Sequence, residues 1–123
     1  MNFTKKTTGE LGEDLAVQFL KKNRYKILEQ NKENHLGEID ILARTPGILK
    51  NDIVIVEVKT KSTKNFGQGY EMVNYFKKRK LITLARELQK EYPSKTIRID
   101  IISVDLSQEK PEIKHFISAV EDN

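Results

Sequence analysis

The chain has 123 residues, of which 37% are hydrophobic and 33% are charged, and it contains no cysteine. This length and composition suit one compact domain, and the lack of cysteine excludes a disulfide framework or a thiolate metal site. The 22 basic residues outnumber the 18 acidic ones, which gives a net charge of +4. Such a charge leans toward a polyanionic partner, although many proteins without one are equally basic.

No hydrophobic run is long enough to cross a bilayer, and the first ten residues lack the hydrophobic stretch of a secretory signal. We therefore expect a cytoplasmic protein with no membrane partner. The two histidines, His35 and His115, match no zinc spacing. Only a hard metal held by carboxylates remains open.

The predicted elements alternate in a way that favours an α/β fold. Thr7 or Thr8 suits the N-cap of a first helix, and Pro93 is a stop signal for a second helix. In chain order we expect a helix to residue 22, strands over 25–30, 38–44 and 52–60, a helix over 70–92, and strands over 97–106 and 112–117. This order predicts a single domain with a mixed central β-sheet flanked by helices. The strands near Val56 and Ile99 should be parallel, because the long second helix joins them.

The first helix places one carboxylate close to its hydrophobic sector. On a helical wheel that sector contains Leu11, Leu15, Ala16, Phe19 and Leu20. Glu13 lies at the edge of the sector. Its carboxylate either reaches water or is partly desolvated and needs a cation or a hydrogen-bond donor.

The second helix places a lysine in its predicted buried stripe. That stripe contains Val73, Phe76, Leu81, Leu84 and Leu88. Lys77 falls near its middle, so its ammonium either extends along the protein surface or meets a buried anion.

Two predicted strands also carry unexpected charges. Asp40 interrupts the hydrophobic segment 39–42, and Glu57 and Lys59 lie within the β-branched strand predicted over 52–60. Side chains alternate along a strand, so Glu57 and Lys59 point the same way. They form either an ion pair at a strand end or half of a catalytic site, and Asp40 alone is equally compatible with a strand-end charge.

A pairing of the two strands would bring Asp40 and Glu57 face to face. Two close carboxylates repel each other at neutral pH, and a divalent cation removes that cost. Magnesium suits such a site because it accepts carboxylate oxygens and keeps several waters. A metal-activated water beside a lysine is what phosphodiester hydrolysis requires.

Basic residues gather near these positions and are candidates for binding nucleic acid. They are Lys61 and Lys64 after the third strand, and Lys77, Lys78, Arg79 and Lys80 at the start of the second helix. Nearby aromatic residues, including Tyr25, Phe66, Tyr70 and Tyr75, could stack on bases. Solvated helix faces explain the run from Lys77 to Lys80 equally well.

These residues also resemble a known family. Asp40 followed by Glu57-Val58-Lys59 resembles the D…(D/E)-x-K signature of the restriction-endonuclease-like, or PD-(D/E)XK, nucleases. Further segments appear in the order of the small bacterial YraN-like family, which is described as endonuclease-like: Gly9-x-x-Gly12-Glu13, Asn31, Gly37-Glu38-Ile39-Asp40, Val56 to Thr60, Arg98-x-Asp100 and His115. The resemblance covers nearly the whole chain.

The resemblance implies one nuclease-like domain over residues 1–123, similar to archaeal Holliday-junction resolvases. It implies a metal-dependent endonuclease that uses Mg²⁺ or Mn²⁺ on DNA, including branched or structured DNA. By this analogy Asp40 and Glu57 are metal ligands, Glu13 supports the metal or its water, and Lys59 is the catalytic lysine. The resemblance also favours a buried anion as the partner of Lys77.

This sequence departs from the family pattern at Glu33, at Lys61 and in the loop before the second helix, which lacks the proline commonly seen there. Glu33 and Lys61 stand where the family often has arginine, which bears on how phosphate is bound. A nucleic-acid-binding module with a vestigial site is the main alternative, and a protein-interaction scaffold is a third. A homodimer is expected only if the substrate has two strands to cut symmetrically.

Overall fold

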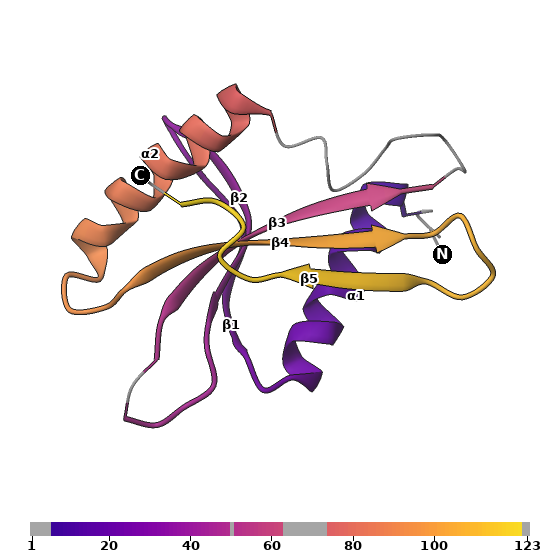
Figure 1. Ribbon diagram of the computed structural model, residues 1–123, viewed down its shortest axis with the longest axis horizontal. Coiled ribbons are helices and arrows are strands. Elements are labelled where there is room, and N and C mark those ends of the chain that lie inside the picture. Colours follow the sequence, from indigo (N-terminus) through magenta and orange to yellow (C-terminus); the bar gives the residue numbers. More distant parts are fainter. Residues whose placement is uncertain (1–5, 50, 63–73, 122–123) are drawn as a thin grey trace, which may run out of the picture.

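The computed structural model describes residues 6–49, 51–62 and 74–121. Two helices cover opposite faces of one five-stranded sheet (Figure 1). The elements are α1 (Thr8–Lys22), β1 (Lys26–Asn34), β2 (Gly37–Arg44), β3 (Ile53–Lys61), α2 (Tyr75–Glu91), β4 (Ile97–Asp105) and β5 (Glu112–Phe116). The predicted α/β class and mixed sheet are confirmed. Within the described residues, neither helix combines the length and hydrophobicity needed to span a membrane.

The sheet has the strand order β1-β2-β3-β4-β5. Neighbouring strands are antiparallel except β3 and β4, which are parallel and pair Val56 with Asp100. The predicted parallel pair joined by the long helix is therefore confirmed. The antiparallel ladder between β2 and β3 ends at the pair Ile41 and Val56, one step before Asp40 and Glu57.

Strand β3 is buried on both faces, as a central strand in a two-layered core should be. Ile53 and Ile55 pack in the cluster that α2 covers, whereas Val54 and Val56 pack in the cluster that α1 covers. Continuing this alternation places Glu57 on the α2 side of the sheet. That is the side from which Lys77 approaches.

Helix α1 begins as predicted, at a capping box. The hydroxyl of Thr7 accepts a hydrogen bond from the backbone N–H of Glu10, and the Glu10 carboxylate accepts one from the backbone N–H of Thr7. This reciprocal arrangement satisfies two backbone donors that a helix start leaves without partners. Helix α2 begins at Tyr75 with Asn74 as N-cap, and not at residue 70. Residues 63–73, including Lys64, Phe66, Tyr70 and Val73, lie outside the described part of the chain.

Two residues predicted to be buried are exposed, and both for the same geometric reason. Leu11 is 44% exposed and Phe76 is 79% exposed. At about 100° per residue, Leu11 lies about 140° from the buried Ala16, and Phe76 lies about 140° from the buried Leu81. Lys77, in contrast, is only about 40° from Leu81, so it points toward the sheet and Phe76 points away.

Candidate active site

The carboxylate of Asp40 lies where β2 and β3 stop pairing. Its Oδ2 atom accepts a hydrogen bond from the backbone N–H of Val58 at 2.9 Å. This hydrogen bond takes the place of the next backbone pair between the strands, and it ties β2 to β3 just beyond Val56. Glu57 precedes Val58 on the same strand and is only 5% exposed.

Glu57 is bound by two ammonium groups. Its Oε1 atom lies 3.1 Å from Nζ of Lys77 and 3.7 Å from Nζ of Lys59. The expectation that Lys77 meets a buried anion is therefore correct, because α2 brings this lysine to Glu57 in the middle of β3. Burial raises the pKa of Glu57, the nearby Asp40 raises it further, and Lys77 and Lys59 oppose the rise.

Glu13 approaches the same region from α1. On the helical wheel Glu13 lies about 60° from Ala16 and between the buried Leu20 and Val17. It is therefore inside the buried sector of α1 and not at the edge of that sector. Burial raises the pKa of Glu13 to about 7, with further contributions from Asp40, Glu38, Asp14 and Glu57. Glu13 and Asp40 both line a hollow of about 470 Å³ together with Thr8, Val58, Thr60 and Ser62.

Helix α1 can approach β3 closely because Gly12, at their contact, has no side chain. A Cβ atom at Gly12 would lie 1.9 Å from Oγ1 of Thr60 on β3. No side chain fits there, so the backbone of α1 can rest against the strand that carries Glu57 and Lys59. Gly9 makes no such contact, because a Cβ there would meet only Oγ1 of Thr7 at 4.0 Å.

Sequence reasoning did not assign two polar side chains that join this group. With its amide nitrogen facing the acceptors, Asn31 on β1 donates to Oε1 of Glu13 and to Oε1 of Glu38, both at 3.0 Å. Asn31 has a φ of 52°, in the left-handed region that asparagine tolerates better than most residues. The family pattern contains Asn31 and Glu38, but nothing in their spacing shows that they meet Glu13.

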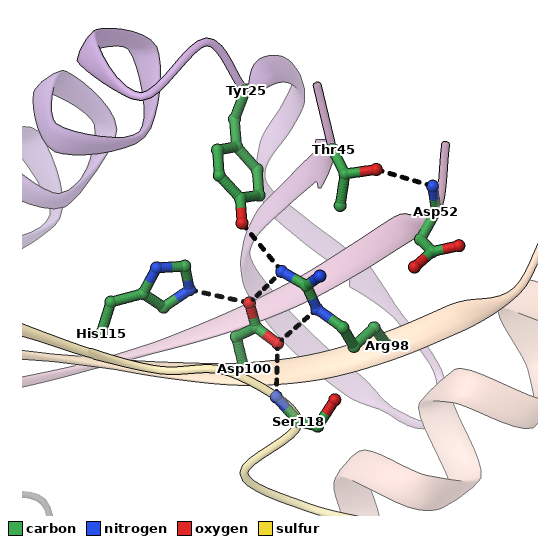
Figure 2. Close-up of polar contacts among 7 residues, drawn as sticks. All are labelled: Tyr25, Thr45, Asp52, Arg98, Asp100, His115 and Ser118. Atoms are coloured by element: carbon green, nitrogen blue, oxygen red, sulfur yellow. Dashed lines mark hydrogen bonds and ion pairs between the residues drawn. The ribbon is translucent and has the colours of Figure 1, made fainter. Parts of the chain in front are cut away.

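A second polar cluster surrounds Asp100, which is fully buried on β4 (Figure 2). Arg98 donates to both of its oxygens, at 2.9 and 2.7 Å, and the backbone N–H of Ser118 donates at 3.0 Å. Nε2 of His115 lies 2.7 Å from Oδ2. Burial alone would raise the pKa of Asp100, but the hydrogen bonds from His115, Arg98 and Ser118 outweigh it and lower that pKa.

This cluster accounts for the Arg98-x-Asp100 and His115 segments of the sequence. Nη2 of Arg98 also donates to the hydroxyl of Tyr25 at 2.9 Å, which ties the start of β1 to β4 (Figure 2). The ring of Tyr25 also contacts that of His115 edge to face, with centroids 5.9 Å apart, and its stacking on a base stays a prediction.

The family described as "Uncharacterised protein family UPF0102" matches residues 12–104. The chain belongs to this family. The UPF0102 protein of Caldanaerobacter subterraneus subsp. tengcongensis is 40% identical over 120 residues, which cover 94% of this chain and 95% of that relative. The UPF0102 protein of Alkaliphilus oremlandii is 42% identical over 121 residues, covering 93% and 97%. The resemblance inferred from the order of the motifs is confirmed.

A solved structure is also similar at a greater distance. A chain described as "Structure of EndoMS-dsDNA2 complex" matches with a TM-score of 0.47 and 20% identity, covering 80% of the UPF0102 chain and 38% of that chain. A likeness this distant assigns neither a substrate nor an activity to the UPF0102 chain.

The donor set of the UPF0102 site fits a magnesium ion held by two carboxylates and water. Within residues 6–49, 51–62 and 74–121, no three histidine or carboxylate side chains form a ready-made metal cage. Asp40 has one oxygen engaged by Val58, and Glu57 has one engaged by the two lysines. Magnesium needs only one or two carboxylates from a protein because it retains several waters, so the pair of Asp40 and Glu57 matches the number of carboxylates that this ion takes.

The predicted nucleic-acid-binding residues occupy two places. Lys61 is half-buried at the end of β3, whereas Lys78, Arg79 and Lys80 are exposed on the first turns of α2. Lys77 differs from its neighbours because Glu57 engages its ammonium. Lys64 lies outside the described residues.

Proposed function

We propose that this UPF0102 protein is a metal-dependent endonuclease, restriction-endonuclease-like in its single domain, which hydrolyses phosphodiester bonds in DNA. Branched or otherwise structured DNA is the proposed substrate class, and the cytoplasm is the proposed location. One observation carries the proposal. Glu13 from α1, Asp40 from β2 and Glu57 from β3 lie in one partly buried region, where burial and the neighbouring carboxylates raise the pKa of Glu13 to about 7, and two lysines lie against Glu57.

The proposed roles follow from these positions. Asp40 and Glu57 would hold Mg²⁺ or Mn²⁺, and Glu13 would support the ion from α1. The ion would activate a water molecule and neutralise charge on the phosphate. Lys59 would stabilise the negative charge that develops on the phosphoryl oxygens, while Lys77 positions the Glu57 carboxylate. Symmetrical cutting of two strands would require a homodimer.

The replacement of Glu57 by glutamine tests the proposal. Glu57→Gln preserves the size of the side chain but removes its negative charge, so we expect loss of Mg²⁺- or Mn²⁺-dependent cleavage with DNA binding retained. Cleavage of a branched substrate and a linear duplex, followed on denaturing gels, measures the first effect. Binding in EDTA measures the second.

Glu87→Gln is a matched control for this experiment. Glu87 lies on α2 and pairs with Lys90 on the same helix at 3.1 Å, away from the proposed site, so this variant should cleave like the wild type. If the wild type cuts no DNA substrate with any divalent metal, the endonuclease proposal fails.

A DNA-binding module with a vestigial site is the second candidate. The ion pairs that Lys59 and Lys77 make with Glu57 favour it, because they neutralise the buried carboxylate without a metal. For this function, wild type and Glu57→Gln would bind DNA alike and neither would cleave it. Binding of either kind should weaken steeply with salt, because phosphate contacts release counterions.

A further inference from the structure

Helix α2 begins with two aromatic side chains that contribute little to either core. Tyr75 is 67% exposed and Phe76 is 79% exposed. Their rings contact each other edge to face, with centroids 5.6 Å apart and planes at 82°. In such an edge-to-face pair each ring keeps at least one face that the other ring does not cover, so the pair offers aromatic faces to solvent.

The pair lies within one helical turn of the proposed active site. Lys77, whose ammonium is 3.1 Å from Glu57, is the next residue after Phe76. At a rise of about 1.5 Å per residue, Tyr75 is only about 3 Å from Lys77 along the helix axis. Around the helix axis, Phe76 lies about 100° and Tyr75 about 160° from Lys77, so the rings would meet a strand that passes from the site around the start of α2.

The charge around the pair indicates which partner it suits. The first turn of α2 has no acidic residue, and the helix sequence has none before Glu87. Lys78, Arg79 and Lys80 follow the aromatic pair and are all exposed. An exposed aromatic face beside cations is complementary to a base next to its phosphates, the combination used by proteins that bind single strands.

We propose that Tyr75 and Phe76 form a stacking platform for an unpaired base of the DNA substrate, while Lys78, Arg79 and Lys80 contact the adjacent phosphates. This inference rests on the proposed function and narrows its substrate class. In a continuous duplex each base is stacked between its neighbours, so its face is not available to a side chain. The platform therefore selects DNA that has an unpaired nucleotide close to the phosphate to be cut, such as a branch point, a flap or a single-stranded end.

Binding measurements without metal test the platform separately from cleavage. The probes are a fluorescently labelled short single strand and the same sequence as a blunt duplex, both titrated in EDTA and followed by fluorescence anisotropy. We expect the wild type to prefer the single strand. Tyr75→Ala/Phe76→Ala should weaken single-strand binding by roughly tenfold or more, the usual effect of losing base–aromatic stacking, and should leave duplex binding unchanged.

Two variants serve as controls. Tyr75→Phe retains the ring and should bind like the wild type. Ile48→Ala/Leu49→Ala removes two side chains that are each 97% exposed on the β2–β3 connection, so it tests for a general loss of hydrophobic surface and should also bind like the wild type. Because Tyr75 and Phe76 are exposed, the double alanine variant should retain the wild-type melting temperature.

Several outcomes would overturn the platform. These are an unchanged affinity of the double alanine variant for the single strand, an equal loss on the duplex, or the same loss in Ile48→Ala/Leu49→Ala. A change of oligomeric state without a change in affinity would show that the pair covers a second copy of the chain instead.

Cleavage is assayed on the same preparations with Mn²⁺. If no protein cleaves DNA but the preference for the single strand depends on the aromatic pair, the endonuclease proposal fails and the platform stands. If the wild type cleaves DNA but shows no such preference, the platform fails and the endonuclease proposal stands.

Discussion

Glu13 lies where burial and neighbouring carboxylates oppose its ionisation, which raises its pKa from 4.5 to about 7. The folded protein therefore holds this proton more tightly than the unfolded chain does. The resulting stabilisation is full below pH 4.5 and is lost as the pH rises through about 7. In metal-free buffer, the free energy of unfolding of the wild type should fall between about pH 5 and 8 relative to that of Glu13→Gln, by on the order of 1 kcal/mol in this partly solvated site.

Urea unfolding in EDTA across that pH range measures the effect. Glu87→Gln is the control, since it removes a carboxylate of the same type from a surface ion pair on α2, and its stability should follow the wild-type pH dependence. A constant difference between the wild type and Glu13→Gln at all pH values would contradict the prediction.

For single residues, the sequence predicted which charged side chains form the candidate site, but not all of their contacts. Strand alternation paired Glu57 with Lys59, and helical periodicity placed Lys77 on the inner face of its helix; the structure shows both. The bridge from Asn31 to Glu13 and Glu38 depends on a left-handed backbone conformation inside a strand, which no residue pattern specifies. Likewise, the contacts of Asp100 with His115 and Ser118 join segments that only the fold brings together.

The approach of α1 to β3 depends on the absence of a side chain at Gly12. A methyl group there would lie 1.9 Å from Oγ1 of Thr60 and 2.9 Å from its Cβ. Gly12→Ala must therefore move the helix from the strand and should lower the free energy of unfolding by about 1–3 kcal/mol, as overpacking generally does. Denaturant unfolding measures the loss.

Gly9→Ala is the matched control for this prediction. A Cβ at Gly9 would meet only Oγ1 of Thr7 at 4.0 Å, so the variant should be as stable as the wild type or gain up to about 1 kcal/mol from helix propensity. The double variant Gly12→Ala/Thr60→Gly removes the opposing atoms and should be less destabilised than the two single changes together. If Gly12→Ala behaved like Gly9→Ala, the close contact would not stabilise the packing of α1.

The elements themselves were largely predictable because their patterns are local. Capping at Thr7, β-branched runs in β3 and β4 and the stop at Pro93 act within a few residues, and the structure shows these elements close to their predicted bounds. The errors concern the ends. Helix α2 begins at Tyr75 because Asn74 caps it, and Phe76 is exposed because the buried stripe begins only at Leu81. The hydrophobicity of the segment alone predicts neither the start of α2 nor the exposure of Phe76.

The proposed site draws residues from both helices and from strands β2 and β3, so it exists only in the folded molecule. An ion held by Asp40 and Glu57 would bind the native state and not the unfolded chain. Such binding raises the free energy of unfolding by RT ln(1 + [L]/Kd), about 2.7 kcal/mol when the ion is at 100 times its dissociation constant. Metal binding should therefore be visible in the stability of the whole protein, independently of any cleavage.

We expect Mg²⁺ or Mn²⁺ to raise the melting temperature of the wild type by several degrees, since about 1 kcal/mol shifts a domain of this size by a few degrees. Asp40→Asn should abolish the shift. Asparagine keeps an oxygen that can accept the hydrogen bond from Val58 but lacks the charge that attracts the ion. Glu109→Gln, at an exposed position in the β4–β5 connection, should keep the full shift. An unchanged melting temperature of the wild type at millimolar Mn²⁺, or an equal shift in Asp40→Asn, would show that these carboxylates do not share a divalent ion.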